Sequence, residues 1–298
     1  METSLLSILI PAFRREAELI QLLETLRPIY QSDLIEVLIG DDSAPVFISI
    51  DDNYLNGSVR LIRNEHNLGM AENLVNLIKI ASGKFVMFMA DDDSINTDEL
   101  LRLVKYLSRF KASDVFLSTC YLRNGKVYRG SLGARNAIKA GQLLEASSHS
   151  PGIVFNRNKL LYEVEESLSY LRSFEIFTLY PQVLFVIILF SKYQTGFWYI
   201  PFSPVRNGYE LPTGLSFFGK DYSVISSRID QLAEFRVFTD QVLSNKFQTK
   251  AHILNGVERF FWTKIFNQIL TLKPPIYLLF RNGIKALWLR LILFIRTR

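Results

Sequence analysis

The chain has 298 residues, of which 49% are hydrophobic, and its formal net charge is +5. This length allows a large core, in one big domain or in a domain with an appendage. The single cysteine, Cys120, excludes an intramolecular disulfide and a cysteine zinc cluster, and its apolar neighbours predict a buried thiol. The first residues are not basic, so we expect no signal peptide. No apolar stretch reaches the ~20 residues of a membrane span. Together these features predict a cytoplasmic protein.

The first hundred residues alternate between short apolar runs and amphipathic segments. An apolar run bounded by turn residues is typical of a buried strand, and apolar residues three and four apart are typical of a helix. Strands are expected over 5–11, 35–40 and 59–63 and from Phe85 onward. Helices are expected around Leu19, Leu22, Leu23 and Leu26, over about 70–81 with Gly83 as its cap, and over 96–110 with Leu100, Leu101, Val104 and Leu107 on one face.

The second part has the same kinds of element in a less regular order. Asn124-Gly125 between two apolar runs predicts a β-hairpin with a type I′ turn. The further expectations are strands over 115–121, 150–156 and 196–201, helices over 137–148, 158–172 and 174–192, a loop over 201–219, and helices from Asp221 to the end with a break at Pro274-Pro275.

Strands and helices that alternate with short links predict an α/β fold with a largely parallel sheet and right-handed crossovers. We expect one such domain over residues 1–219 and a helical region over 220–298.

Polar residues stand where the predicted strands end, and the most acidic group is Asp91-Asp92-Asp93. Ligands bind at the carboxyl ends of the strands in open α/β sheets. Three adjacent carboxylates repel one another unless a positive charge lies between them. Asp91 and Asp93 are suited to one hard cation, Mg²⁺ or Mn²⁺, which in turn can hold a diphosphate. The alternative is a solvated acidic turn before a helix, with Asn96 as its cap and Glu99 three residues later.

Four strand-end groups occur together: Pro11-Ala-Phe-Arg14, Asp41-Asp42-Ser43, Asn67-Leu-Gly69 with Asn73, and Asp91-Asp92-Asp93. In this order and spacing they resemble the family 2 glycosyltransferases, which have the GT-A fold. The resemblance covers residues 4–110 well and 150–205 loosely. Phe155-Asn-Arg157 and Tyr180-Pro-Gln182 give a more distant similarity to bacterial O-antigen sugar transferases of the abequosyltransferase type.

The resemblance implies a role for each matching position. Asp91 and Asp93 would be the Asp-x-Asp element that binds Mg²⁺ or Mn²⁺. The nucleotide-sugar donor would be bound by Pro11, Ala12, Arg14, Glu16, Asp41, Asp42, Asn67, Gly69, Asn73, Asp91 and Asp92. A divalent cation would stabilise the charge on the departing nucleoside diphosphate. For Gly69, Asn73 and Arg14 the alternatives are a turn glycine, a helix-surface residue and a solvated helix-start residue.

One departure concerns the general base. Family members carry an acidic pair, often Glu-Asp, before the helix that leads to the last strand, and this chain has Gln182-Val183 there. The nearest acid is Glu175, whose apolar neighbours suit a base of raised pKa. A structural ion pair is the alternative role, and His149 is the second candidate base.

The last 40 residues are basic and apolar. Residues 259–298 contain eight of the 34 Lys and Arg residues and none of the 29 Asp and Glu residues. Basic residues interleaved with Trp, Phe and Leu suit an interfacial segment on anionic lipid. The alternative is a basic helix docked on the catalytic domain. No nucleic-acid-binding motif accompanies the charge.

These observations predict a metal-dependent, inverting glycosyltransferase that is peripheral on the inner face of the cell membrane. Its acceptor would be a hydroxyl of a lipid-linked glycan, in O-antigen or other surface polysaccharide synthesis. Two alternatives stay open. A nucleotidyltransferase shares this fold, but it would normally show a Gly-rich, Arg-containing loop after the first strand, where this chain has Pro11-Ala-Phe-Arg14. A non-catalytic membrane-bound scaffold would explain the missing Glu-Asp pair.

Overall fold

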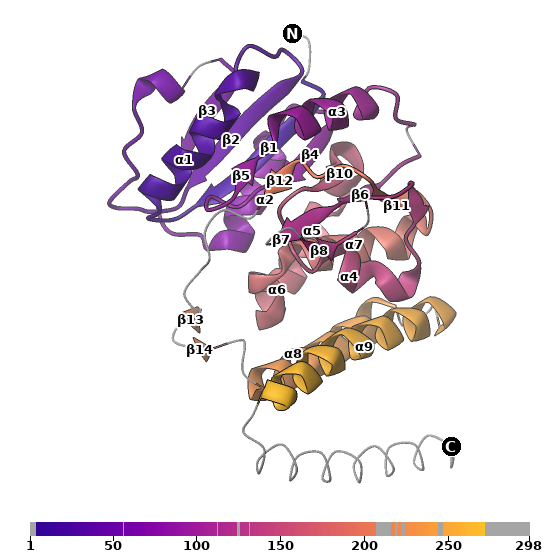
Figure 1. Ribbon diagram of the computed structural model, residues 1–298. Coiled ribbons are helices and arrows are strands. Elements are labelled where there is room, and N and C mark those ends of the chain that lie inside the picture. Colours follow the sequence, from indigo (N-terminus) through magenta and orange to yellow (C-terminus); the bar gives the residue numbers. More distant parts are fainter. Residues whose placement is uncertain are drawn as a thin grey trace, which may run out of the picture.

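The computed structural model describes residues 4–55, 57–111, 113–123, 126–130, 132–206, 216–217, 220–221, 225–243 and 247–271 (Figure 1). Its centre is an eight-stranded sheet with the order β3-β2-β1-β4-β10-β6-β11-β9. The strands of this sheet are β1 (Leu6–Ala12), β2 (Ile35–Asp41), β3 (Val59–Arg63), β4 (Phe85–Phe88), β6 (Phe116–Thr119), β9 (Asn136–Ala137), β10 (Ile153–Asn156) and β11 (Phe197–Ile200).

The sheet is parallel from β3 through β2 and β1 to β4. Strand β10 is antiparallel to both β4 and β6, β11 is parallel to β6, and β9 is antiparallel to β11. The predicted α/β fold is therefore confirmed, with a parallel first half and a mixed second half. In the parallel half the carboxyl ends of β1, β2 and β4 meet at one edge, which we call the carboxyl edge of the sheet.

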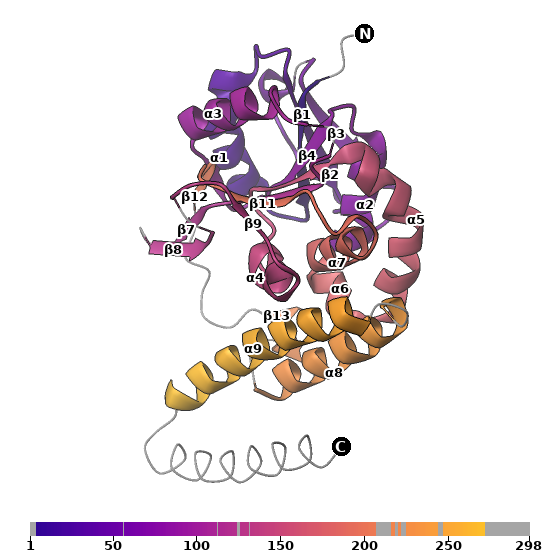
Figure 2. The same ribbon diagram turned by 90° about the vertical axis from the view of Figure 1, so that its right-hand side faces the viewer.

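Helices cover both faces of this sheet (Figures 1 and 2). Side chains of one strand alternate between the faces: Ile8 and Ile10 of β1 pack with α1 and α3, whereas Leu9 packs in the core that α2, α5 and α7 share. The helices are α1 (Glu16–Leu26), α2 (Met70–Ile80), α3 (Thr97–Leu107), α4 (Leu143–Ser147), α5 (Arg157–Ser173), α6 (Glu175–Leu179), α7 (Pro181–Tyr193), α8 (Ile225–Val242) and α9 (Phe247–Thr271), with single 3₁₀ turns η1 (Arg27–Ile29), η2 (Asp52–Tyr54) and η3 (Ala140–Gln142).

A second, four-stranded sheet lies next to the site. Its order is β5-β12-β7-β8, with β5 (Ser94–Ile95), β7 (Tyr121–Arg123), β8 (Lys126–Arg129) and β12 (Val205–Arg206). The predicted hairpin is confirmed by the antiparallel pairing of β7 with β8. Its Asn124-Gly125 turn lies outside the described residues, as does most of the predicted loop over 201–219. The remaining described strands, β13 (Ser216–Phe217) and β14 (Lys220–Asp221), pair with each other.

Of the helix expected over 137–148 only Leu143–Ser147 is α-helical, because Ala137 belongs to β9 and Ala140–Gln142 forms η3. Three details of the other predicted helices were also wrong. The last residue of α2 is followed by Ala81 in extended backbone, so Gly83 is not a left-handed cap. Gly83 instead lies against β1, where an added Cβ would come within 2.5 Å of the Ser7 hydroxyl. In α3 the buried face includes Leu103, whereas Leu101 is 46% exposed.

The third error is the single helix expected over 174–192. The segment is split into α6 and α7, and Pro181 is the first residue of α7. Proline lacks the N–H that a continuing helix needs, but it is well suited to a first helical position. All residues from Pro181 to Ser191 are buried, which agrees with the predicted burial of this segment.

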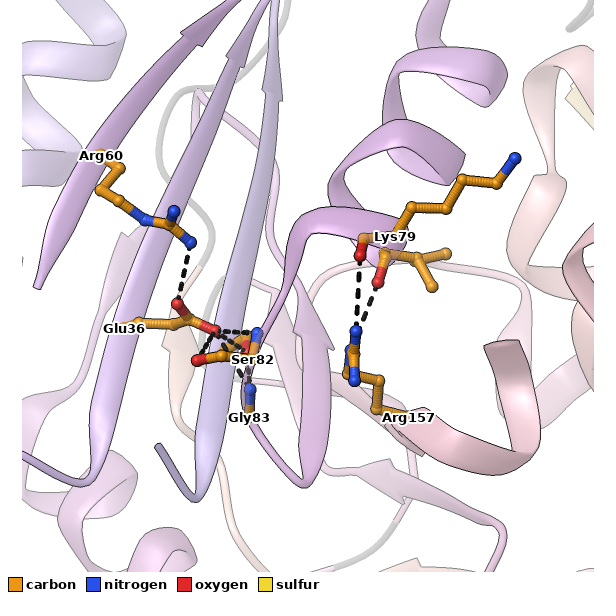
Figure 3. A network of polar contacts seen from close by, with 8 residues as sticks. Glu36, Arg60, Lys79, Ser82, Gly83 and Arg157 are labelled. Carbon is orange, nitrogen blue, oxygen red and sulfur yellow. Dashed lines mark hydrogen bonds and ion pairs between the residues drawn. The ribbon is translucent and has the colours of Figure 1, made fainter. Parts of the chain in front are cut away.

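The edge opposite the carboxyl edge is held by Glu36, the second residue of β2 (Figure 3). Its Oε1 accepts hydrogen bonds from the Ser7 hydroxyl at 2.5 Å, the Ser82 N–H at 2.5 Å and the Gly83 N–H at 3.1 Å. Its Oε2 is 3.2 Å from Arg60. Burial acts to raise the pKa of Glu36, but these hydrogen bonds outweigh it and lower that pKa. The carboxylate thus fastens the segment before β4 to β1 and β2.

Arg157, the first residue of α5, closes the end of α2 at the same edge (Figure 3). Its guanidinium lies 3.4 Å from the carbonyl oxygens of Ile78 and Lys79. The last carbonyls of a helix have no partner within the helix, so a cation is favourable there.

Helices α8 and α9 pack beneath α4, α6 and α7 (Figures 1 and 2). Gly256 of α9 touches Gly141 of η3 so closely that an added Cβ would come within 2.2 Å of the Gly141 carbonyl oxygen. Phe261 and Ile265, in the basic segment of the sequence, are buried. This segment therefore packs on the α/β part of the protein as far as it is described, and residues 272–298 lie outside the described structure. No helix among the described residues is long and apolar enough to cross a membrane.

Candidate active site

The segment after β1 leaves the sheet in an unusual backbone conformation. Ala12 is buried, Pro11 is half-buried, and Arg14 has a φ of 58°. A side chain at positive φ costs free energy that the surroundings must offset, and such residues cluster at functional sites. The Arg14 N–H donates to the Ser43 hydroxyl at 2.9 Å, which fixes this turn against the end of β2. The exposed Glu16 accepts a hydrogen bond from the Ser49 N–H at 2.8 Å, which fixes the start of α1 to the segment that follows β2.

Asp41 ends β2 and is fully buried. One of its oxygens accepts from the Ser43 N–H at 3.0 Å and the other from the Ile48 N–H at 2.9 Å. The carboxylate thus shapes the loop over 42–48. Each oxygen keeps a second lone pair, so the predicted contact with a nucleotide stays a prediction.

Asp42 organises the loop that precedes α2. Its carboxylate accepts from the N–H groups of Leu68 at 2.8 Å and Gly69 at 2.7 Å, and from the Asn64 amide at 3.0 Å. Gly69 has a φ of 77°, and an added Cβ would meet no atom within 4 Å. The backbone at Gly69 therefore faces open space, as close approach of a ligand requires.

Asn73 supports this loop from inside the protein. It is buried, donates to the Gly40 carbonyl at 2.7 Å and accepts from Asn64 at 3.1 Å. The alternative that Asn73 is a helix-surface residue was therefore wrong. Asn67 is exposed, and its side-chain oxygen accepts from the Gly69 N–H at 2.8 Å.

The acids after β4 are separated by a cation from the other side of the edge. Arg15 Nη1 lies 3.1 Å from Asp91 Oδ1 and 2.7 Å from Asp92 Oδ2. Burial raises the pKa of Asp91 to about 6, although Arg15 acts to lower it. Sequence reasoning required a positive group among these acids but did not name it. Arg15 follows β1 as the acids follow β4, and the parallel pairing of these strands brings them together.

Asp93 is buried and accepts from the Tyr121 hydroxyl at 3.1 Å. The Tyr121 ring packs against the imidazole of His149, with 4.1 Å between the ring centroids. The structure therefore connects one predicted metal ligand to one predicted base through a tyrosine that the sequence did not identify. Glu175, the other candidate base, is exposed at the start of α6, and that helix packs on α2 and α8.

Arg129 fastens the segment that carries His149. It is only 1% exposed and donates to the carbonyl of Thr119 at 3.1 Å, to that of Pro151 at 2.8 Å, and to that of His149. Burial lowers the pKa of Arg129 to about 10. No sequence signal distinguished this arginine, because its partners come from two other stretches of chain, around Thr119 and over 149–151.

The donors at the carboxyl edge fit a divalent cation bound together with a phosphate. Among the described residues there is no group of three or more His, Cys, Asp or Glu side chains placed to hold a metal ion by themselves. Mg²⁺ is commonly held by one or two carboxylates plus substrate phosphates. Asp91 and Asp93, each 7% exposed, are carboxylates of this kind.

A sheet that is parallel in its first half and mixed in its second, with paired acids after β4 and an open loop before α2, defines an α/β protein of the GT-A fold. The family model for Glycosyl transferase family 2 matches residues 7–168, more than half of the chain, and the chain belongs to this family of glycosyltransferases. The predicted family is thereby confirmed. The O-antigen type and the similarity to abequosyltransferases stay predictions.

The chain is also similar to two other proteins. An uncharacterized glycosyltransferase of Haemophilus influenzae is 30% identical over 105 residues, and the alignment spans 35% of each chain. The crystal structure of S. aureus TarS 1–349 has a TM-score of 0.60 and 18% identity, and the match covers 91% of this chain and 76% of that one. The same TarS fragment in complex with UDP-GlcNAc gives a TM-score of 0.62, also at 18% identity, and covers 77% of that chain. At such low sequence identity, the structural similarity shows a shared fold and nothing more.

Proposed function

We propose that this protein transfers a sugar from a nucleoside-diphosphate-sugar donor to a hydroxyl of a lipid-linked glycan, with inversion, in O-antigen or other surface polysaccharide synthesis. The observation that carries the proposal is the carboxyl edge, where the buried Asp91 and Asp93 lie at the end of β4 near the loop that Asp42 holds open at Gly69. Family membership supports the class of reaction.

In this proposal the donor lies along the ends of β1, β2 and β4. Pro11, Ala12, Arg14 and Glu16 line its nucleotide, and Asp41 and Asp42 accept hydrogen bonds from the base or ribose. The loop with Asn67 and Gly69, supported by Asn73, lets the diphosphate approach the backbone. Arg15 forms ion pairs with Asp91 and Asp92 and so reduces the repulsion among the three acids.

Mg²⁺ or Mn²⁺ would be held by Asp93 and Asp91 together with the donor's phosphates. When bound, the cation stabilises negative charge on the departing nucleoside diphosphate. The protein's own part is to supply two carboxylates at one strand end and to shield them from bulk water. The burial that raises the pKa of Asp91 also makes its ionised form bind a cation more strongly.

The general base is proposed to be Glu175 or His149. The support for His149 is its ring contact with Tyr121, whose hydroxyl donates to Asp93, one of the proposed metal ligands. Glu175 lies at the exposed start of α6. A general base contributes roughly 10²–10⁴-fold. The variants Glu175→Gln and His149→Ala, compared for transfer rate at unchanged donor affinity, distinguish the two.

Calorimetric titration with nucleotide and Mn²⁺ tests the proposal. Because the TarS fragment of similar fold was crystallised with UDP and with UDP-GlcNAc, these are the first ligands to use. We expect metal-dependent binding to the wild type, weakened at least tenfold in Asp93→Asn and retained in Asp33→Asn, an exposed acid that precedes β2. Binding that is unchanged in Asp93→Asn contradicts the metal assignment, and no binding of any nucleotide sugar contradicts the function.

The proposed location is the inner face of the cell membrane, with anionic lipid contacted by the basic residues over 259–298. The support is their composition, since each Lys or Arg near an anionic leaflet contributes about 1 kcal/mol. Co-sedimentation with liposomes across a salt series tests it. Equal binding to neutral and anionic liposomes, or no binding, contradicts the proposed attachment.

A further inference from the structure

A hollow lies where the helix pair α8 and α9 meets the catalytic part. Its cavity volume is about 70 Å³, and its mouth is open to solvent. Its walls come from the α4 segment, the α6–α7 junction, α8 and α9. The residues that line it are Leu144, Ser148, Tyr180, Val183, Arg228, Phe235, Phe260, Phe261 and Lys264.

The charged side chains that line this hollow are cations. Arg228 enters from α8 and Lys264 from α9, and the lining includes no Asp or Glu. Arg228 Nη1 makes two long contacts with uncharged groups, 3.4 Å to the Tyr180 hydroxyl and 3.2 Å to Gln231 Oε1. Among the described residues Arg228 has no ion pair. A half-buried guanidinium without a carboxylate partner is suited to an anion brought by a ligand.

Two buried donors beside the hollow also have no hydrogen-bond partner in the described structure. They are Nε of Arg228 and Nε2 of Gln231, whose side chain is only 4% exposed. Leaving a buried donor unsatisfied costs roughly 1–3 kcal/mol. A ligand with several acceptor oxygens would satisfy such donors, and a phosphate group has three or more.

The rest of the wall is apolar or aromatic, with Leu144, Val183, Phe235, Phe260 and Phe261. A small hydrophilic anion gains no free energy from contact with such a wall, whereas an anion that carries a hydrocarbon chain gains free energy by burying the chain against it. The position is also informative. Ser148 lines the hollow, and the next residue is His149, which contacts Tyr121 in the site.

We infer that this hollow binds the phosphate ester group of the acceptor, and that the acceptor is a glycan phosphate or diphosphate ester with an apolar chain. This inference rests on the proposed function and names the chemistry of its acceptor. Arg228 would bind the phosphate oxygens with its fork of N–H groups, and Lys264 would add a second positive charge. The aromatic residues of α8 and α9 would contact the first part of the chain. The glycan would then extend past Ser148 toward the donor.

Calorimetry with farnesyl diphosphate tests the inference. The donor site is first saturated with UDP and Mn²⁺, so that the probe cannot bind there. We expect binding to the wild type, and Arg228→Gln should weaken it roughly tenfold to a hundredfold, the usual effect of losing a charged hydrogen-bond donor. Arg236→Gln is the matched control, because Arg236 lies on the same helix but pairs with Glu258 outside the hollow.

The other outcomes overturn the inference. If Arg228→Gln and Arg236→Gln bind the probe as the wild type does, the hollow is not the site. If Arg259→Gln alone weakens binding, the probe lies in a second hollow beside η3, which Arg259 lines. If inorganic pyrophosphate binds as tightly as farnesyl diphosphate, the apolar wall has no part and a free phosphate is the ligand.

Kinetics separate this inference from the proposed function. Arg228→Gln should raise KM at least tenfold for a lipid-diphosphate-linked acceptor, with the affinity for UDP and Mn²⁺ unchanged. A short acceptor glycoside without phosphate should show the same KM in both proteins. If UDP binds and sugar transfer is observed but Arg228→Gln leaves both KM values unchanged, only the acceptor site is wrong. If no transfer occurs with any donor, the proposed function itself fails.

Discussion

The two edges of the parallel sheet hold buried carboxylates in opposite ways. Glu36, near the start of β2, receives hydrogen bonds from Ser7, Ser82 and Gly83, and they lower its pKa. Asp91, after the end of β4, is buried against Arg15, and burial raises its pKa to about 6. Both acids connect segments that are distant in the sequence. The difference is that hydrogen bonds outweigh the effect of burial on the pKa of Glu36, whereas burial outweighs the effect of Arg15 on the pKa of Asp91.

This contrast separates a structural acid from one available to a ligand. A carboxylate whose charge the fold already stabilises gains little from a further cation. A buried carboxylate that the fold stabilises poorly gains much more, and functional sites are enriched in such groups. The edge with Glu36 should therefore respond to mutation in stability, and the edge with Asp91 and Asp93 should respond in activity.

The largest effect is expected for Asp93→Asn. It should lower the transfer rate by roughly 10²–10³-fold, the usual range for losing one group that stabilises transition-state charge. The free energy of unfolding should change little, because an amide oxygen can still accept from Tyr121. Initial rates with a nucleotide sugar and urea unfolding measure the two quantities. A stability loss as large as the activity loss would remove the contrast between the edges.

The second effect is on pH dependence and concerns Asp91 in the absence of metal. Because its pKa is raised from 3.8 to about 6, the folded state binds a proton more tightly than the unfolded state. The unfolding free energy of the wild type should therefore fall as pH rises from about 4 to 7, relative to Asp91→Asn, by up to about 3 kcal/mol. Urea unfolding of both proteins at several pH values checks this. If the unfolding free energies of the two proteins change in parallel with pH, burial does not raise the pKa of Asp91.

Glu36→Gln tests whether the edge of the sheet opposite the site acts on stability alone. An amide in place of the carboxylate loses charge-assisted hydrogen bonds from Ser7 and the 82–83 segment, so we expect a loss of about 2 kcal/mol at pH 7. The lowered pKa means that this stabilisation is present above pH ~4.5 and is lost as pH falls through the folded-state pKa. Donor affinity should stay unchanged. A weaker donor affinity at equal stability would link this edge to the site.

The smallest effect is expected at Gly69. Gly69→Ala should cost about 1 kcal/mol of stability or somewhat more, because a φ of 77° with a ψ of 158° is a conformation that is essentially restricted to glycine, even where there is space for a Cβ. If the donor passes close to this backbone, the methyl group should also weaken nucleotide binding several-fold. Binding as tight as in the wild type would place the donor farther from the loop.

The elements of the parallel half were predictable because their signals are local. A strand that is buried on both faces usually consists of consecutive apolar residues, and β1, β2 and β4 each contain such a run. The acids that follow such runs must meet at one edge once the strands are parallel. Helix boundaries were less reliable. The segment over 174–192 was predicted as one helix because it is strongly apolar throughout, although Pro181 indicates a break between two helices.

The connecting residues of the site were not predictable, because their roles depend on distant contacts. Arg129 is part of a hairpin strand, and nothing in Lys-Val-Tyr-Arg shows that it will bind the carbonyls around His149. Tyr121 ends an apolar run and reads as another core residue, yet its hydroxyl reaches Asp93, 28 positions earlier in the chain. Arg15 was visible as a cation at a strand end, but its partners follow a strand that is distant in sequence.

The close contact between Gly141 and Gly256 determines where the far end of α9 lies relative to the α/β part of the protein. With no side chain at either position, backbone rests on backbone, and the helix is held at one height against η3. Lys264 lies eight residues farther along the same helix, about 12 Å away at 1.5 Å per residue. The width of the hollow that Lys264 and Phe260 line is thus set by a contact outside it. A single methyl group at Gly256 would tilt or shift the helix and reshape the hollow without touching any residue in it.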